Sequence, residues 1–185
     1  MARYSQLALF QSPIYPADMT ITSVLSFKVT DSTELIDARG PRFGAIITTI
    51  ILTAALALES WPLLIWQLSV FALGAFKSPQ ATPYAWIYRK FVKPRLRGDI
   101  PTEDVRPPQF AQVIGFLFTL SALALVFFGA SGGATVVIGF ALAAAFLNAA
   151  FNFCLGCEMY LMILRLRSAL SARRTREDSY NLPSL

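Results

Sequence analysis

Two long stretches of this chain contain almost no charge. Residues 43–76 carry one charged side chain, Glu59, and residues 110–157 carry none. Uncharged apolar runs of about 18 or more residues are typical of membrane-spanning helices. A soluble domain carries about a quarter charged residues, whereas this chain has 15%. We therefore expect an all-α integral membrane protein whose main partner is the lipid bilayer.

Each stretch is too long for one span. As a single helix, residues 43–76 would be roughly 50 Å long, against a hydrocarbon core of roughly 30 Å. Glu59-Ser60-Trp61-Pro62 predicts a break, because it combines a charge, a capping serine, an interfacial aromatic and a helix-starting proline. Ser131-Gly132-Gly133 predicts a second tight turn. The sequence thus predicts four transmembrane helices as two helical hairpins, spanning about 43–58, 60–76, 110–130 and 134–157.

The segments outside the spans are polar. Residues 77–109 form a basic, proline-rich connection, in which Tyr84–Val92 is expected to be an amphipathic helix at the lipid headgroups. Residues 1–36 form an N-terminal arm, with strand-forming residues at 21–30 and helix-capping chemistry at 31–34. We expect the membrane domain to cover residues 37–167 and a basic tail to follow at residues 168–185.

The basic residues predict the orientation of the spans. The turns near Glu59 and Gly132 contain no Lys or Arg, whereas Arg39 and Arg42, the 77–109 connection and the C-terminal tail are basic. Cytoplasmic loops carry the excess of Lys and Arg. Both ends of the chain and the middle connection are therefore expected in the cytoplasm, which agrees with an even number of spans.

Composition also excludes several classes of function. The chain has no histidine, which rules out a Ser-His-Asp triad or a histidine-rich metal site within it. Its aromatic residues lie in or beside the apolar runs and do not interleave with basic groups, so we expect no nucleic-acid partner. The first 20 residues lack the apolar run of a cleavable signal. No cofactor can be assigned from these features.

The fourth predicted span carries a stripe of small and polar residues. Ala141, Ala145, Asn148 and Asn152 fall within about 60° of one another around a helix. Small residues let helices approach closely, and asparagine amides bond across such contacts. The stripe is thus either a helix-packing surface or the polar lining of a substrate path.

A pair of cysteines, Cys154 and Cys157, follows this stripe, with Glu158 directly after it. The spacing is compatible with thiol–disulfide exchange, with a packed structural pair, or with metal binding in which Glu158 is a third ligand. If the helix continues unbroken to Arg165, its dipole does not favour a thiolate here. If Gly156 breaks it, a new helix near Glu158 would place Cys157 at an N-terminus, where a thiolate is favoured.

Several motifs together resemble a bacterial membrane family, domain of unknown function 4395, over residues 37–167. The motifs are Asp37-Ala38-Arg39-Gly40-Pro41-Arg42-Phe43-Gly44-Ala45, Arg95-Leu96, Pro107-Pro108-Gln109-Phe110-Ala111-Gln112 and Asn148-Ala149-Ala150-Phe151-Asn152-Phe153-Cys154-Leu155-Gly156-Cys157-Glu158. Members often carry glycine where this chain has Asn152. The resemblance implies a bacterial cytoplasmic membrane and companions of the thioredoxin-like and sulfurtransferase types, an association that carries no mechanism.

Two hypotheses of function follow. In the first, Cys154 and Cys157 cycle between dithiol and disulfide to handle a sulfur species, Glu158 moves the proton, and Arg39 and Arg42 draw in an anionic partner; these arginines would otherwise anchor to lipid phosphates. In the second, the chain is a non-catalytic accessory subunit of a larger membrane complex. A third hypothesis, that the chain is a small transporter, has less support in the sequence. The substrate or partner site of the first hypothesis comprises Arg39, Arg42, Gln112, Asn148 and Asn152.

Overall fold

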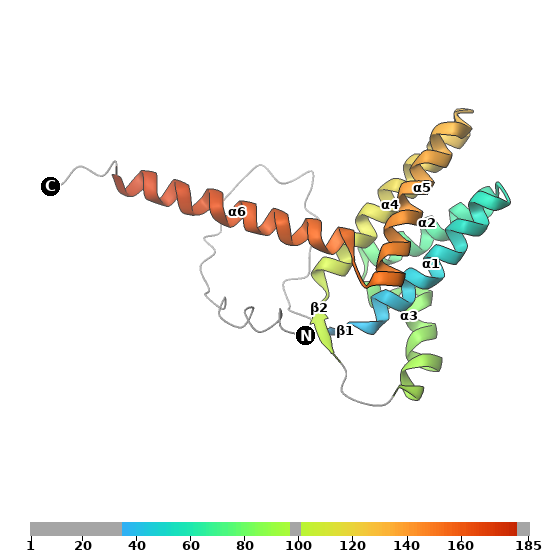
Figure 1. Ribbon diagram of the computed structural model, residues 1–185, viewed down its shortest axis with the longest axis horizontal. Helices are drawn as coiled ribbons and strands as arrows, with labels where there is room; N and C mark the ends of the chain where they lie inside the picture. Colours follow the sequence, from blue (N-terminus) through green and yellow to red (C-terminus); the bar gives the residue numbers. More distant parts are fainter. Residues whose placement is uncertain (1–34, 97–100, 181–185) are drawn as a thin grey trace.

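Four apolar helices form the body of the protein (Figure 1). The computed structural model describes residues 35–96 and 101–180, with side chains in the last helix as far as Arg173. The helices are α1 (Arg39–Ala57), α2 (Trp61–Phe76), α4 (Arg106–Phe127) and α5 (Ser131–Phe151). Each packs against two others, in the cyclic order α1, α2, α4, α5. The all-α prediction is confirmed, with one small sheet added.

Helices α1, α4 and α5 are long and apolar enough to cross a membrane. Helix α2 is equally apolar but has 16 residues, a length of about 24 Å against a hydrocarbon core of roughly 30 Å. These lengths and compositions are those of a multi-pass membrane protein.

The turns between the helices follow local backbone chemistry. Helix α1 ends at Ala57, and α2 begins at Trp61 with Pro62 in its first turn, as the sequence predicted. The second turn is not where we expected it. It lies at residues 128–130, where Gly129 has a φ of 77°, and Ser131 already begins α5. Glycine adopts this left-handed conformation without steric cost, so Gly129 makes the turn.

Residues 77–96, the first part of the connection between α2 and α4, are mostly helical. A 3-10 turn, η2 (Pro79–Ala81), leads into α3 (Pro83–Ile87), a π-helical segment η3 (Tyr88–Val92) and a second 3-10 turn η4 (Lys93–Arg95). The predicted amphipathic helix at Tyr84–Val92 is therefore helical. On its exposed side, the Lys90 ammonium lies 4.8 Å from the ring centroid of Trp86, a pairing suited to the headgroup region.

A two-stranded antiparallel sheet lies at the start of α1 and α4. Strand β1 (Leu35–Asp37) pairs with β2 (Thr102–Asp104), with Ile36 opposite Glu103. The sequence did not predict this sheet. The strand-forming residues at 21–30 and the capping residues at 31–34 lie outside the described part of the chain.

The core contains polar as well as apolar groups. Its apolar cluster consists of Leu52, Ala55, Leu64, Ala122, Ile138 and Ala141. Gln67 is fully buried: its amide donates to Thr48 (3.3 Å) and its carbonyl accepts from Tyr84 (2.9 Å). Buried polar groups without partners cost folding free energy, and these bonds tie α1, α2 and α3 together.

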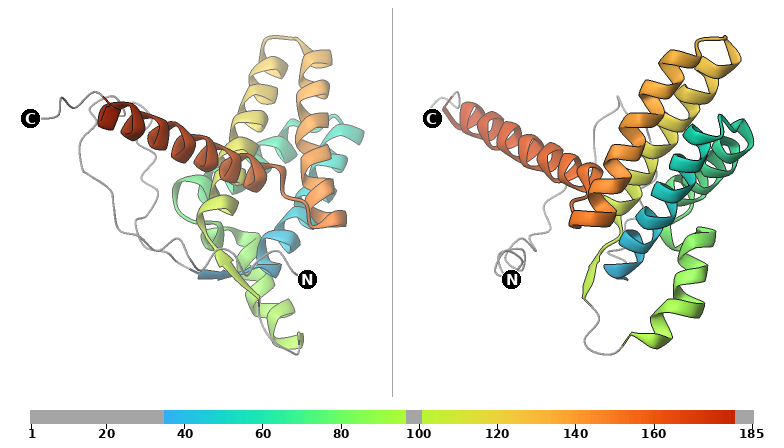
Figure 2. Two further views of the ribbon diagram at one scale, coloured as in Figure 1. Left: turned by 60° about the vertical axis from the view of Figure 1, so that its left-hand side comes forward. Right: turned by 45° about the vertical axis from the view of Figure 1, so that its right-hand side comes forward.

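The last helix leaves the bundle. Helix α6 (Leu155–Tyr180) extends sideways from the end of the bundle at which α5 ends and α1 and α4 begin (Figures 1 and 2). The fourth span was expected at residues 134–157. The helix that contains most of it ends at Phe151, so the cysteine pair lies in a separate structural element.

Candidate functional site

The chain breaks between α5 and α6 at Asn152, which has φ 55° and ψ 32°. Asparagine is one of the few residues other than glycine that adopts this left-handed conformation readily. The N–H groups of Asn152 and Phe153 donate to the carbonyls of Asn148 (3.1 Å) and Leu147 (3.3 Å). These bonds satisfy the end of α5 and turn the chain. Glycine adopts this conformation without steric cost.

The two cysteines occupy the start of α6. Cys154 directly precedes the first helical residue, and Cys157 lies in the first turn. They form a disulfide with a Cα–Cα distance of 5.2 Å. The N–H of Cys157 donates to the Cys154 sulfur (3.3 Å), and the N–H of Glu158 donates to the Cys154 carbonyl (3.0 Å). The sulfur of Cys154 thus takes the place that a capping oxygen normally has.

The break differs in place from the one considered at Gly156. It comes at residues 152–154, and α6 runs without interruption through Gly156 and Glu158. Gly156 has another role, because a Cβ atom built there would lie 2.7 Å from Cα and Cβ of Ala111. Only glycine lets the first turn of α6 approach α4 this closely. A ring contact between Phe110 and Tyr160, with centroids 5.7 Å apart, continues this packing.

The two predicted arginines lie at the start of α1. The Nε–H of Arg42 donates to the carbonyl of Ala149 (3.2 Å), in the last turn of α5 and three residues before Asn152. Arg42 is therefore brought close to the cysteine turn. Arg39 is the first residue of α1, and its backbone N–H donates to the Asp37 carboxylate (3.1 Å).

One of the three predicted amides, Gln112, lies away from the cysteine turn. Gln112 points toward α2: a Cβ atom at Gly74 would lie 2.8 Å from its side chain, and its buried Oε1 has no hydrogen-bond partner. Asn148 is half-buried in α5, and Asn152 and Glu158 are exposed. The structure brings Arg42, the Asn152 turn and the cysteines together, and it turns Gln112 toward another helix.

A family model described as Domain of unknown function (DUF4395) matches residues 36–165, which is well over half of the chain. The chain belongs to this family. The resemblance seen in the motifs is thereby confirmed. No curated protein and no solved structure matches the chain.

The DUF4395 match covers the structural features described so far. It begins in β1, includes the four apolar helices and the cysteine turn, and ends at Arg165 within α6. Within the described part of this DUF4395 chain, no three His, Cys, Asp or Glu side chains gather closely enough to hold a metal ion.

Sequence reasoning missed a second polar cluster in the DUF4395 chain. The Asp37 carboxylate accepts from the hydroxyl of Tyr88 (3.0 Å) and lies 4.0 Å from the ammonium of Lys93. Burial, reinforced by the charge of Asp37, raises the pKa of Glu103 to about 7. Burial, with the hydrogen bond to Asp37, raises the pKa of Tyr88 to about 12. The only signal in the sequence was Asp37 in the first family motif, since the sheet that brings Glu103 to it joins residues far apart in the chain.

Proposed function

We propose that this protein carries out thiol–disulfide exchange at the surface of the bacterial cytoplasmic membrane, with Cys154 and Cys157 as the exchanging pair. One observation carries the proposal: the cysteines are disulfide-bonded, half-exposed, and placed at the N-terminal end of α6, just beyond the end of an apolar helix. Helix N-termini stabilise thiolates through their free N–H groups and dipole. A pair buried in the middle of an unbroken span would have neither access nor this stabilisation.

The exchange we propose needs a partner dithiol protein of the thioredoxin-like class. A thiolate of the partner attacks one sulfur of the Cys154–Cys157 disulfide, giving a mixed disulfide and one released thiolate. The second partner thiol then displaces the cysteine, which leaves the partner oxidised and this pair as a dithiol. Two electrons and two protons pass from the partner to the pair, and the reverse reaction reduces a partner disulfide.

Residues near the pair have distinct roles in this proposal. The N–H of Cys157, which now bonds to the Cys154 sulfur, would stabilise a Cys154 thiolate after reduction. The exposed carboxylate of Glu158 would accept the proton of the attacking partner thiol, so that this thiol reacts as a thiolate. Arg42 would hold the end of α5 beside the pair, and its charge, with that of Arg39, would attract an anionic partner surface. Asn148 and Asn152 would shape the turn through their backbone groups.

The proposed topology has four spans as two hairpins, with both ends of the chain in the cytoplasm. Arg39, Arg42 and Arg106 lie at the end of the bundle from which α6 extends. The turns at residues 58–60 and 128–130, at the other end, contain no Lys or Arg. This asymmetry supports a cytoplasmic location for the cysteine turn.

Equilibration with glutathione redox buffers tests the proposed chemistry. The full chain in nanodiscs is trapped with a polyethylene-glycol maleimide, and the gel shift gives the reduced fraction. An exchange pair should titrate above about −300 mV, whereas structural disulfides lie below that value. Cys157→Ser should accumulate a mixed disulfide through Cys154, and Cys154→Ser with Cys157→Ser should show neither signal. A pair that stays oxidised below that potential, with no mixed disulfide, would reject the proposal and favour a structural link in an accessory subunit.

A further inference from the structure

One face of α6 carries large apolar side chains that are exposed in the described part of the chain. Its large apolar residues recur at helical spacing and fall within about 100° around the helix axis. Met162 is 64% exposed and Leu166 is 61% exposed. We call this face the α6 stripe; its members are Leu155, Met159, Met162, Ile163, Leu166 and Leu170.

We propose that the α6 stripe lies on the membrane surface and that the arginines beside it bind anionic phospholipid headgroups. Arg165 and Arg167 flank the stripe on its two sides, and Arg173 follows Leu170 by less than one turn. No acidic residue occurs from Met159 to Arg173. Basic residues next to an exposed apolar face characterise helices that lie in the plane of an anionic membrane surface.

The position of α6 on the bundle fits such a surface. Its first turns pack on α4 through Gly156 against Ala111 and Tyr160 against Phe110, within two turns of the start of α4. Helix α6 therefore leaves the bundle close to the level at which the apolar helices end. If those helices span a bilayer, α6 starts at its surface and the stripe continues their apolar belt.

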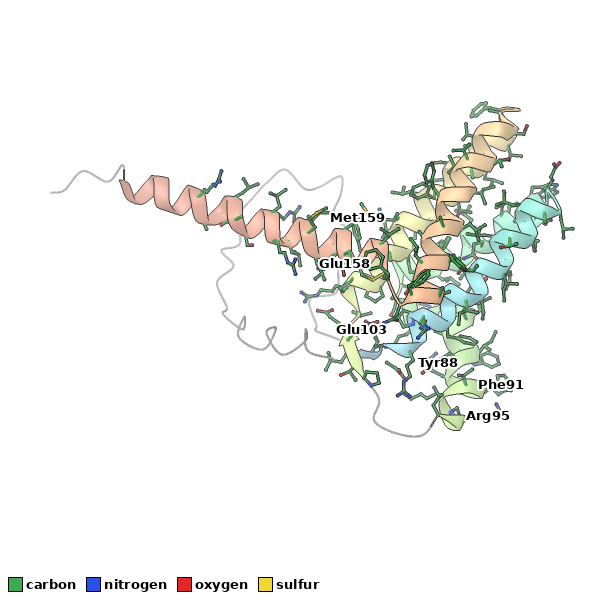
Figure 3. All side chains as sticks on the ribbon, viewed as in Figure 1. Tyr88, Phe91, Arg95, Glu103, Glu158 and Met159 are labelled. Carbon is green, nitrogen blue, oxygen red and sulfur yellow. A yellow bond between two sulfur atoms is a disulfide. The ribbon has the colours of Figure 1, made fainter. Side chains whose placement is uncertain are left out.

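The stripe also faces the appropriate way. In Figure 3, the labelled Met159 projects from the upper side of α6, the direction in which the bundle helices rise from this end. Lipid surrounding the bundle would occupy the space on that side. A helix lying there buries its apolar face among the acyl chains, and its long arginine side chains reach the phosphates.

Site-directed spin labelling of the full chain tests the immersion of the stripe. Cys154→Ser and Cys157→Ser remove the native thiols, so the outcome is independent of the proposed thiol chemistry. One label is placed by Met162→Cys on the stripe and, as the matched control, another by Leu164→Cys on the opposite face; both positions are exposed in the structure, at 64% and 40%. The protein is reconstituted at one copy per nanodisc, in equal parts of phosphatidylcholine and phosphatidylglycerol.

We expect the label at position 162 to collide several-fold more with oxygen than with a water-soluble nickel complex, and the label at 164 to show the reverse. Equal nickel access at both positions would overturn the proposal and leave the stripe to a protein partner. A triple variant, with Arg165→Gln, Arg167→Gln and Arg173→Gln, tests the arginines. In the anionic bilayer it should lower the ratio of α6 bound to the membrane surface to α6 free of it about a hundredfold, since each arginine contributes about 1 kcal/mol there. An equal loss in pure phosphatidylcholine would overturn the role of anionic headgroups.

Discussion

Arg42 in α1 and Ala149 in α5 are joined by a hydrogen bond of 3.2 Å from the arginine Nε–H to the alanine carbonyl. Carbonyls in the last turn of a helix lack partners within the helix, and a cation is favoured beside them. The bond therefore stabilises the end of α5 and fixes the first turn of α1 beside it. The cysteine turn begins three residues later, so its position depends on this contact.

Replacing Arg42 should loosen this end of the bundle. Because the side chain is exposed, we expect Arg42→Ala to cost about 1 kcal/mol of unfolding free energy, which lowers the melting temperature by about 2–4 °C. Circular dichroism in detergent micelles measures the change. Arg42→Lys keeps a cation near the carbonyl of Ala149, so its melting temperature should fall by less than that of Arg42→Ala. A melting temperature unchanged in Arg42→Ala would show that the bond contributes nothing to stability.

Gly156 should not tolerate a side chain. Gly156→Ala places a methyl group 2.7 Å from the backbone and Cβ of Ala111, so α6 must move away from α4, at a cost of about 1–3 kcal/mol. Gly139→Ala is the matched control, because nothing lies within 4 Å of a Cβ atom there; it should be neutral or slightly stabilising. Equal melting temperatures for the two variants would contradict the close contact between the helices.

The conformation of Asn152 predicts an order among its replacements. Asn152→Gly should be neutral, because glycine adopts a φ of 55° freely. Asn152→Ala should cost about 1–2 kcal/mol, because a Cβ atom clashes with the following carbonyl in this conformation and alanine cannot form the local hydrogen bonds of asparagine. Thermal unfolding of the two variants in the same detergent tests the order. Asn152→Ala as stable as Asn152→Gly would show that the turn does not need a left-handed residue.

The length of the uncharged apolar runs was enough to predict the four apolar helices α1, α2, α4 and α5, because a candidate membrane span is recognised by length and composition alone. The break before Pro62 was predicted because residues 43–76 are too long for one span and Pro62 suits the first turn of a helix. The break at Asn152 was not predicted, since asparagine also suits helix–helix packing and only the backbone angles separate the two roles. Gln112 was placed with the cysteines because both were assigned to the same membrane side; which way a residue faces around a helix depends on tertiary packing. The β1–β2 sheet pairs residues that are 65 to 69 positions apart in the chain, from Asp37 with Thr102 to Leu35 with Asp104, and no local sequence pattern predicts such a pairing.

Glu103 should make stability fall as the pH rises. Its pKa is raised to about 7 in the native protein, whereas an unfolded glutamate titrates near 4.3. Between about pH 4.5 and about pH 7 the unfolded chain releases a proton that the native protein retains, so the unfolded state gains relative stability across this window. Below this pH range Glu103 is protonated in both states and does not lower the free energy of unfolding; above it Glu103 is ionised in both states and the whole decrease in that free energy remains. The Glu103→Gln side chain cannot ionise, so the free energy of unfolding of this variant should stay constant through the window and be higher than that of the wild type at about pH 8.

Asp37→Asn removes the neighbouring charge but keeps a side-chain acceptor for the N–H of Arg39. This variant should therefore lower the pKa of Glu103 and narrow the pH window over which stability falls. Melting temperatures measured from about pH 5 to about pH 8 test both variants. Parallel curves for wild type and Glu103→Gln would show that Glu103 ionises alike in the folded and unfolded states.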